Sequence, residues 1–202
     1  MPHTGRVRPK KSNNVKRDFL GDSYDLVKSF WHRVLADWAP LFADPFFIPD
    51  DLREDYSCLT GIEMLPTPPP ERFSIINDPD TGIRLPWEAN QREGRTHTTI
   101  SAIISQLEEL RPKCIITFDQ SNYRHSGYTL EQQRHVKLEE LRMRLRYGFY
   151  YRSHAPFLFT FNNQGDMQHV RTILVDAGIP ADRIEQISGV SEKIGGRSRN
   201  LT

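Results

Sequence analysis

The sequence predicts a single α/β domain with a Rossmann-like, three-layer fold and a mostly parallel central sheet. Two observations lead to this prediction. Short apolar runs of strand length alternate with amphipathic segments of ten to twenty residues, a pattern typical of βαβ units. One of these runs, CIITF at 114–118, is apolar almost throughout, as in a strand that is buried on both faces of a parallel sheet.

The elements of the first half follow in a readable order. The first predicted helix lies within 22–38, where apolar side chains recur at helical spacing and Asp22 or Ser23 can cap the N-terminus. A strand-like run, LFADPFFIP, comes next and is broken at Asp44. A short helix over 50–61 then leads, through the proline-rich connector LPTPPPER, to a second strand, FSII.

The second half repeats the alternation of helix and strand. A helix over 96–110 precedes the CIITF strand. A long helix over 129–147 is expected to begin with a capping box of Thr129 and Gln132 and to stop at Gly148. The strand APFLFTF, a helix closed by Gly178 and a short strand in RIEQI complete the expected domain.

Both ends of the chain are expected to lie outside the folded domain, which we place at 18–188. Residues 1–17 contain six Arg or Lys and no acid and predict a flexible basic arm, and 189–202 predict a flexible polar and basic tail. No signal-peptide pattern and no apolar run of membrane-spanning length is visible, and the 2 cysteines give no disulfide framework. We therefore expect a cytoplasmic protein without a membrane partner; the sequence does not indicate its oligomeric state.

Polar residues follow each predicted strand. In a parallel sheet, ligands bind beyond the carboxyl ends of the strands, so these positions are candidates for a functional site. The loop before the first helix can face the same edge. The candidates are Asp22 and Asp25 at the start of that helix, Asp44, then Asn77, Asp78 and Asp80, then Asp119, Gln120, Ser121 and Asn122, and finally Asn162, Asn163 and Gln164.

Carboxylates that gather at one edge repel one another unless a cation or an arginine joins them. Oxygen ligands of this kind suit Mg²⁺ or Mn²⁺, whose usual chemistry is metal-assisted attack on a phosphoester. The first hypothesis is therefore a metal-dependent enzyme that acts on a phosphoester in nucleic acid or a nucleotide. Asp78, Asp80 and Asp119 are the expected catalytic residues; the expected metal ligands are Asp78, Asp119, Asp44 and Asp22, and the expected substrate contacts are Arg124, Asn77 and Ser121.

A structural interpretation competes with this hypothesis. Asp and Asn are common where a strand turns into a helix, because their side chains cap helices and close turns. His154 precedes the strand APFLFTF and would lie at the wrong end of it in a parallel sheet, so we expect a structural or interface role for it. The sequence has no zinc-ligand spacing, no phosphate-binding P-loop and no G-x-S-x-G motif.

Basic and aromatic residues gather around the predicted helix 129–147. Such a combination can clamp single-stranded nucleic acid, so nucleic acid bound through this region and the basic arm is a possible partner. A solvated outer helix face is the alternative. The residues concerned are Arg124, Arg134, Lys137, Arg142, Arg144, Arg146 and Arg152, with Tyr123, Tyr128, Tyr147, Tyr150 and Tyr151 near them.

The order of elements resembles that of class I, Rossmann-type methyltransferases that act on adenine in nucleic acids. By this resemblance LFADPFFIPDD falls at the cofactor loop and FSIINDPDTG at the target-binding loop, which implies S-adenosylmethionine as cofactor and roles for Asp44, Asn77, Asp78 and Pro79. The sequence departs from the family at both loops: Phe46-Phe47 replaces glycines, and Asp80-Thr81 replaces the base-stacking pair. A methyltransferase-like enzyme is the second hypothesis, and a non-catalytic Rossmann-like binding module is the third.

Overall fold

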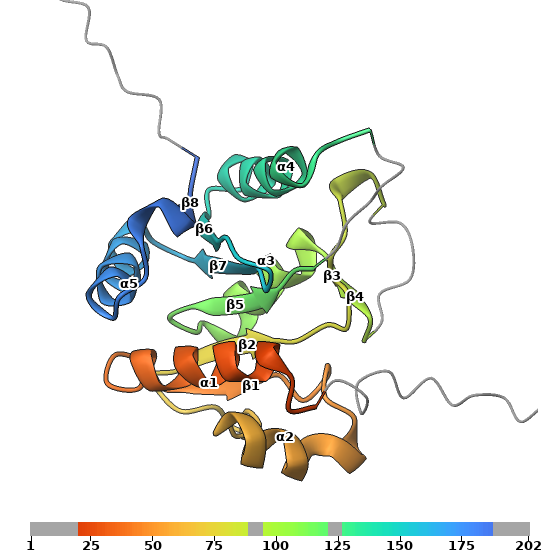
Figure 1. Cartoon of the computed structure of the whole chain (residues 1–202), viewed down its shortest axis with the longest axis vertical. Helices are drawn as coiled ribbons and strands as arrows, with labels where there is room; N and C mark the ends of the chain where they lie inside the picture. The colour runs from red at the N-terminus through yellow and green to blue at the C-terminus, as the bar shows by residue number, and fades with distance from the viewer. Residues whose placement is uncertain (1–19, 89–94, 121–126, 188–202) are drawn as a thin grey trace, which may run out of the picture.

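The computed structural model describes residues 20–88, 95–120 and 127–187 (Figure 1). The predicted arm at 1–17 and tail at 189–202 lie outside these residues.

Six strands form one sheet in the order β1-β2-β5-β7-β6-β8. They are β1 (Leu41–Ala43), β2 (Ser74–Asn77), β5 (Ile115–Phe118), β7 (Phe157–Phe161), β6 (Tyr147–Tyr151) and β8 (Ile184–Glu185), and a parallel pair, β3 (Gly82–Ile83) and β4 (His97–Thr98), lies beside this sheet. The α-helices are α1 (Ser23–Leu35), α2 (Arg53–Thr60), α3 (Ile100–Leu110), α4 (Leu130–Met143) and α5 (Gln164–Asp176), with short 3-10 turns at η2 (Asp50–Leu52), η3 (Pro86–Glu88) and η4 (Ala181–Arg183).

The prediction of an α/β domain is confirmed, but the sheet is mixed. The pairs β1–β2 and β2–β5 run parallel, whereas β5–β7, β7–β6 and β6–β8 run antiparallel. The difference arises at β6, where the sequence analysis predicted no strand: it placed Tyr147 at the end of a helix and Gly148 at the helix stop. The connection 152–156 between β6 and β7 is too short for a parallel crossover, so these two strands can pair only as an antiparallel hairpin.

Gly148 lies within β6 and does not end the preceding helix as predicted. A Cβ atom at this position would lie 2.8 Å from the carbonyl oxygen of Phe159 and 2.9 Å from Leu141 Cδ1. Glycine is therefore required where α4 and β7 approach β6 most closely. The helix before it ends at Met143, earlier than predicted, and its N-terminus carries the expected capping box of Thr129 and Gln132.

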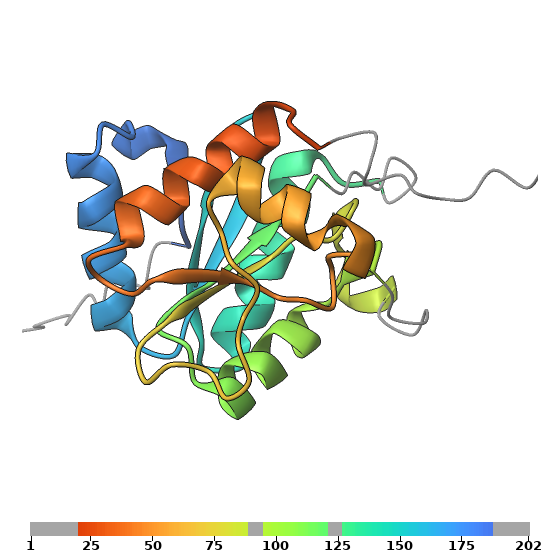
Figure 2. The same ribbon diagram turned by 90° about the horizontal axis from the view of Figure 1, so that it is seen from below.

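The two faces of the sheet are buried by different helices (Figures 1 and 2). Side chains alternate along each strand, so Ile76 and Ile116 join one apolar cluster, whereas Ile75 and Ile115 join the other. Buried residues of α1, α2 and α5 belong to the first cluster, and those of α3 and α4 belong to the second. We refer below to the α1 face and the α3 face of the sheet.

The connections that follow β1 and β2 leave the sheet on opposite faces. After β1 the chain forms α2 on the α1 face and returns at Met64, which bridges Ala43 in parallel. After β2 the chain forms α3 on the opposite face before it enters β5. A crevice is expected beyond the carboxyl ends of two parallel strands whose connections diverge in this way, and this is where open α/β sheets bind ligands.

No helix in the described ranges is both long enough and apolar enough to cross a membrane.

Candidate functional site

The residues predicted to form the site are divided between the two faces of the sheet. Asn77 is paired with Thr117 at the end of the β2–β5 ladder, so consecutive residues beyond this point face opposite sides. Asp78 contacts Lys28 of α1 on the α1 face. Asp119 contacts Lys137 of α4, so it lies on the α3 face. The two carboxylates therefore do not share one site, although both follow parallel strands as predicted.

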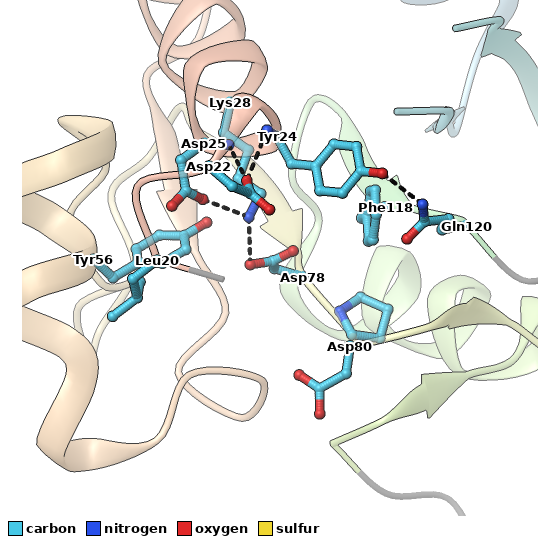
Figure 3. A pocket seen from close by; sticks show the side chains of 11 residues that line it. Leu20, Asp22, Tyr24, Asp25, Lys28, Tyr56, Asp78, Asp80, Phe118 and Gln120 are labelled. Carbon is cyan, nitrogen blue, oxygen red and sulfur yellow. Dashed lines mark hydrogen bonds and ion pairs between the residues drawn. The ribbon is translucent and has the colours of Figure 1, made fainter. Parts of the chain in front are cut away.

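Asp78 lies in an acidic pocket beyond the carboxyl ends of β2 and β5, on the α1 face (Figure 3). The pocket has a volume of about 90 Å³, enough for a small chemical group. Four carboxylates and one lysine line the pocket, so its formal charge is negative. Its lining residues are Leu20, Asp22, Tyr24, Asp25, Lys28, Tyr56, Asp78, Pro79, Asp80, Phe118 and Gln120.

A buried ion triad forms one wall of the acidic pocket. The ammonium of Lys28 donates to Asp25 Oδ1 and to Asp78 Oδ2, each at 2.8 Å, and all three residues are buried. Burial alone would lower the pKa of Lys28, but the charges of Asp78 and Asp25 outweigh it and raise the pKa above its usual value. Lys28 is therefore a fixed cation and not a nucleophilic amine.

The hydroxyl group of Tyr56 points into the same pocket (Figure 3). Tyr56 is fully buried, and its oxygen has no hydrogen-bond partner among the described residues. Burial and the carboxylate of Asp78 raise the pKa of Tyr56, so the hydroxyl keeps its proton. Tyr56 therefore presents a protonated hydroxyl at the pocket wall, where it can donate to a group that binds there.

The opposite wall carries a second phenol. The side-chain amide of Gln120 donates to the Tyr24 hydroxyl at 2.5 Å, which leaves the phenolic proton for another acceptor. Asp22 caps α1, as predicted, by accepting from the backbone N–H groups of Tyr24 and Asp25. His154 lies beside this wall, 3.4 Å from Ser23 Oγ and 5.6 Å between ring centroids from Tyr24.

His154 was expected at the far end of its strand from the site, and this prediction was wrong. Because β7 runs antiparallel to β5, the residues that precede β7 lie at the carboxyl end of β5. The same reversal places Asn162, Asn163 and Gln164 at the opposite edge of the sheet, away from Asp78 and Asp119. Asn163 caps α5 there by accepting from the Asp166 N–H group.

Asp119 belongs to a second buried network, beneath β3. Its Oδ2 accepts from Lys137 Nζ and from the Tyr150 hydroxyl, both at 2.7 Å, and its Oδ1 accepts from the Ile83 N–H group at 2.9 Å. Every one of these groups is buried. Asp119 therefore ties β5, α4, β6 and β3 together, and its catalytic role stays a prediction.

Gly82 allows β3 to lie directly on Asp119. A Cβ atom at Gly82 would lie 2.5 Å from Asp119 Oδ1 and 2.7 Å from its Cα, and the φ angle is +124°. We expect Gly82→Ala to lower the free energy of unfolding by about 2–4 kcal/mol, from the clash and the strained backbone together. Urea denaturation would measure this change.

Gly178→Ala is the matched control, since Gly178 has a φ of +96° but no atom within 4 Å of an added Cβ. The free energy of unfolding of this variant should fall by about 1 kcal/mol, the cost of the positive φ angle for alanine alone. Equal losses in the two variants would show that β3 does not press on Asp119.

Asp44 and Asn77 lie together on the α3 face. Gln106 of α3 joins them: its Nε2 donates to Asp44 Oδ2 at 2.8 Å and to Asn77 Oδ1 at 3.3 Å. The Asn77 amide donates in return to Gln106 Oε1 at 2.7 Å. Burial raises the pKa of Asp44, partly offset by the hydrogen bonds from Phe46 N and Gln106.

Three predicted site residues remain to be placed: Asp80, Ser121 and Arg124. Asp80 lines the acidic pocket, whereas Ser121 and Arg124 lie outside the described residues. Within the described ranges, no three His, Cys, Asp or Glu side chains are grouped so that they could hold a metal ion. A Mg²⁺ or Mn²⁺ site therefore stays a prediction.

Several of the bases expected to meet nucleic acid pair with acids of the chain. Arg134 donates to Glu185 at 2.9 Å and Lys137 is buried against Asp119. The other ion pairs along α4 and its C-terminal end are Arg142 with Glu139, Arg144 with Glu140 and Arg146 with Glu108. These contacts fit the alternative of a charged outer helix, and a nucleic-acid partner stays a prediction.

Comparisons of the chain with protein-family models, with curated proteins and with solved structures gave no match. The resemblance to methyltransferases therefore stays a prediction. The acidic pocket has to be interpreted from its own chemistry.

Proposed function

We propose that the protein is an enzyme whose active site is the acidic pocket, and that its substrate places a small hydroxyl-bearing group there, as in a sugar or a related polyol. The observation that carries this proposal is the buried hydroxyl of Tyr56, which lies next to the Lys28–Asp78 ion pair and has no hydrogen-bond partner within residues 20–88, 95–120 and 127–187. We further infer that β1, β2 and β5 act as the parallel half of a Rossmann-like, three-layer fold, with the ligand beyond their carboxyl ends.

The pocket offers a complementary set of donors and acceptors for hydroxyl groups. The phenols of Tyr56 and Tyr24 supply protons, whereas Asp22 and Asp78 supply carboxylate oxygens. Carboxylates accept from hydroxyl groups without needing a metal, and the aromatic side chain of Phe118 supplies an apolar surface for the carbon skeleton.

Asp78 is the residue proposed to act as the base. Its Oδ2 accepts from the ammonium of Lys28 at 2.8 Å, and the position at the end of β2 brings the carboxylate to the pocket wall. An ionised carboxylate within hydrogen-bond reach of a substrate hydroxyl can take its proton as that oxygen forms a bond to an electrophilic centre. Tyr56, which stays protonated, would donate to negative charge that develops on the substrate.

The phosphoester hypothesis remains a second candidate because four carboxylates line this pocket. A phosphate group would be repelled by them unless a divalent cation entered with it. Binding that requires both a phosphorylated compound and Mg²⁺ would favour this candidate over a neutral polyol.

The test is a binding screen of the full chain by calorimetry, with neutral sugars and with sugar phosphates, each with and without Mg²⁺. The proposal expects a neutral sugar to bind without metal. Tyr56→Phe should weaken that binding about five- to tenfold, the worth of one hydrogen bond. Its free energy of unfolding should stay unchanged or rise, because the substitution removes an unpaired buried hydroxyl.

Thr160→Val is the matched control for this test. Thr160 Oγ1 is likewise buried without a hydrogen-bond partner in the described residues, but it lies in β7 and not at the pocket. This variant should bind the sugar as the wild type does. A Tyr56→Phe protein that binds with unchanged affinity would contradict the proposed site.

A further inference from the structure

A second, larger cavity lies on the α3 face at the crevice between β1 and β2. Its volume is about 500 Å³, within the usual range for sites that bind small molecules. It shares no lining residue with the acidic pocket. The lining residues are Asp44, Phe46, Phe47, Asn77, His97, Thr98, Ser101, Ala102, Ser105, Gln106, Glu109 and Leu110. This location is independent evidence for a site, because the connections after β1 and β2 diverge there.

The polar wall of the cavity is held in one orientation by hydrogen bonds. Asp44 can only accept when ionised, so the amide nitrogen of Gln106 must face it. Gln106 and Asn77 then form a reciprocal amide pair with two hydrogen bonds. The buried Asn77 amide keeps its second N–H, and Asp44 and Asn77 keep lone pairs, so the wall offers a donor beside acceptors.

The entrance of the cavity carries an aromatic side chain. Phe46 is 51% exposed, and its ring packs edge-on against buried Phe47 with 5.1 Å between centroids. A large apolar ring left half-exposed at the mouth of a polar cavity offers a stacking surface. The hydroxyl groups of Ser101 and Ser105, one helical turn apart on α3, line the cavity as well.

The charge of the cavity excludes phosphate as the preferred ligand. Asp44 and Glu109 are its acids, and none of its described lining residues is Lys or Arg. His97 adds no positive charge near neutral pH, because burial and Arg84 lower its pKa. A neutral ligand therefore fits better than an anion.

We propose that this cavity binds a neutral, planar heterocycle with adjacent hydrogen-bond donors and acceptors, of the chemical class of a nucleobase. The heterocycle would stack on Phe46 and place its polar edge on the amide pair of Asn77 and Gln106. This inference does not depend on the function proposed for the acidic pocket, since the two sites are lined by different residues.

The test uses free adenine, cytosine and uracil with the full chain, followed by calorimetry or by ligand-observed NMR. At least one base should bind in the wild type, and Phe46→Ala should weaken it by about fivefold or more, as expected for loss of a stacking side chain. Folding should be kept, because Phe46 is half-exposed. Met143→Ala, at a 76% exposed residue of α4, is the control and should bind normally.

Any of the following outcomes would overturn the proposal. One is that none of the three bases binds at millimolar concentration. Another is that a base binds but Phe46→Ala leaves its affinity unchanged. If Tyr56→Phe instead weakens the binding of the base, the base occupies the acidic pocket, and the proposal for this cavity is equally wrong.

Discussion

Lys28→Met should lower the free energy of unfolding by about 3–5 kcal/mol, measured by urea denaturation at neutral pH. The substitution keeps much of the side-chain volume but leaves Asp25 and Asp78 as two buried carboxylates without their shared cation. Removing one partner of a buried ion pair costs this much, because the remaining charge is no longer compensated. Asp25 keeps a hydrogen bond from the Gly21 N–H group, which offsets part of the loss.

Asp50→Asn is the control for this prediction, because it removes the ion pair and keeps the hydrogen bonds from Arg53 to the carbonyl oxygens of Pro45 and Ile48. Arg53 pairs with Asp50 at the same 2.8 Å, but the two side chains are 37% and 79% exposed. The control should lose less than about 1 kcal/mol, since water screens an exposed pair. A Lys28→Met protein that is as stable as the control would show that the triad is not buried as described.

The pH dependence of the wild type follows from the direction of the Lys28 shift. The folded protein raises the pKa of Lys28 above its ordinary value of 10.5. The stability that Lys28 contributes is therefore complete below pH 10.5. It is lost only as the pH rises through the raised pKa that Lys28 has in the folded protein. Lys28 should cause no loss of stability between pH 7 and pH 10.

The sequence predicted the scaffold on the parallel side of the sheet. Hydrophobic periodicity and capping residues identified α1, α2, α3 and α5, because these signals are local. Thr129 and Gln132 fixed the start of α4 for the same reason. In the antiparallel half, β7 and β8 were also predicted, but β6 and the strand directions were not. Gly148, inside YGFYY, was interpreted as a helix stop, whereas it serves close packing within β6.

The candidate site was predicted in part. Position after a strand is a local property, so Asp44, Asp78 and Asp119 were found at the carboxyl ends of β1, β2 and β5. Their division between two faces depends on the register of β2 and β5, which places Asn77 opposite Thr117. No local pattern encodes this register.

The lysines that compensate these acids were also missed. Lys28 lies three residues after Asp25 on one side of α1, a spacing that indicates an ion pair but is common on exposed helices. Lys137 was interpreted as one of several solvated bases of α4, although it is only 1% exposed. The expectation that clustered acids need a cation is met within the protein, by a lysine on each face.

The two buried lysines differ in one physical respect. Lys28 faces two carboxylates, which raise its pKa despite burial. Lys137 faces the carboxylate of Asp119 while Arg134 lies near it, so burial prevails and lowers its pKa. The stability that depends on Lys137 therefore rises with pH, from the lowered folded pKa up to the ordinary value of 10.5.

Lys137→Met should destabilise the fold by about 3–5 kcal/mol at neutral pH, because it leaves the Asp119 carboxylate buried without a cation. The loss should shrink as the pH falls. A buried carboxylate without a cation is less costly once it is protonated, so uptake of a proton by Asp119 should stabilise the folded variant as the pH falls. Chemical denaturation at a series of pH values between 4 and 8 would measure both effects.

The double variant Asp119→Asn/Lys137→Met separates charge from packing. The new amide can still accept from the Ile83 N–H group and donate to the Tyr150 hydroxyl, so no charge stays buried. We expect it to recover about 2 kcal/mol or more over Lys137→Met and to lose the pH dependence of that variant. If the double variant is instead less stable than Lys137→Met, Lys137 contributes through its packing, and the assignment of Asp119 to a charge-compensated structural network is wrong.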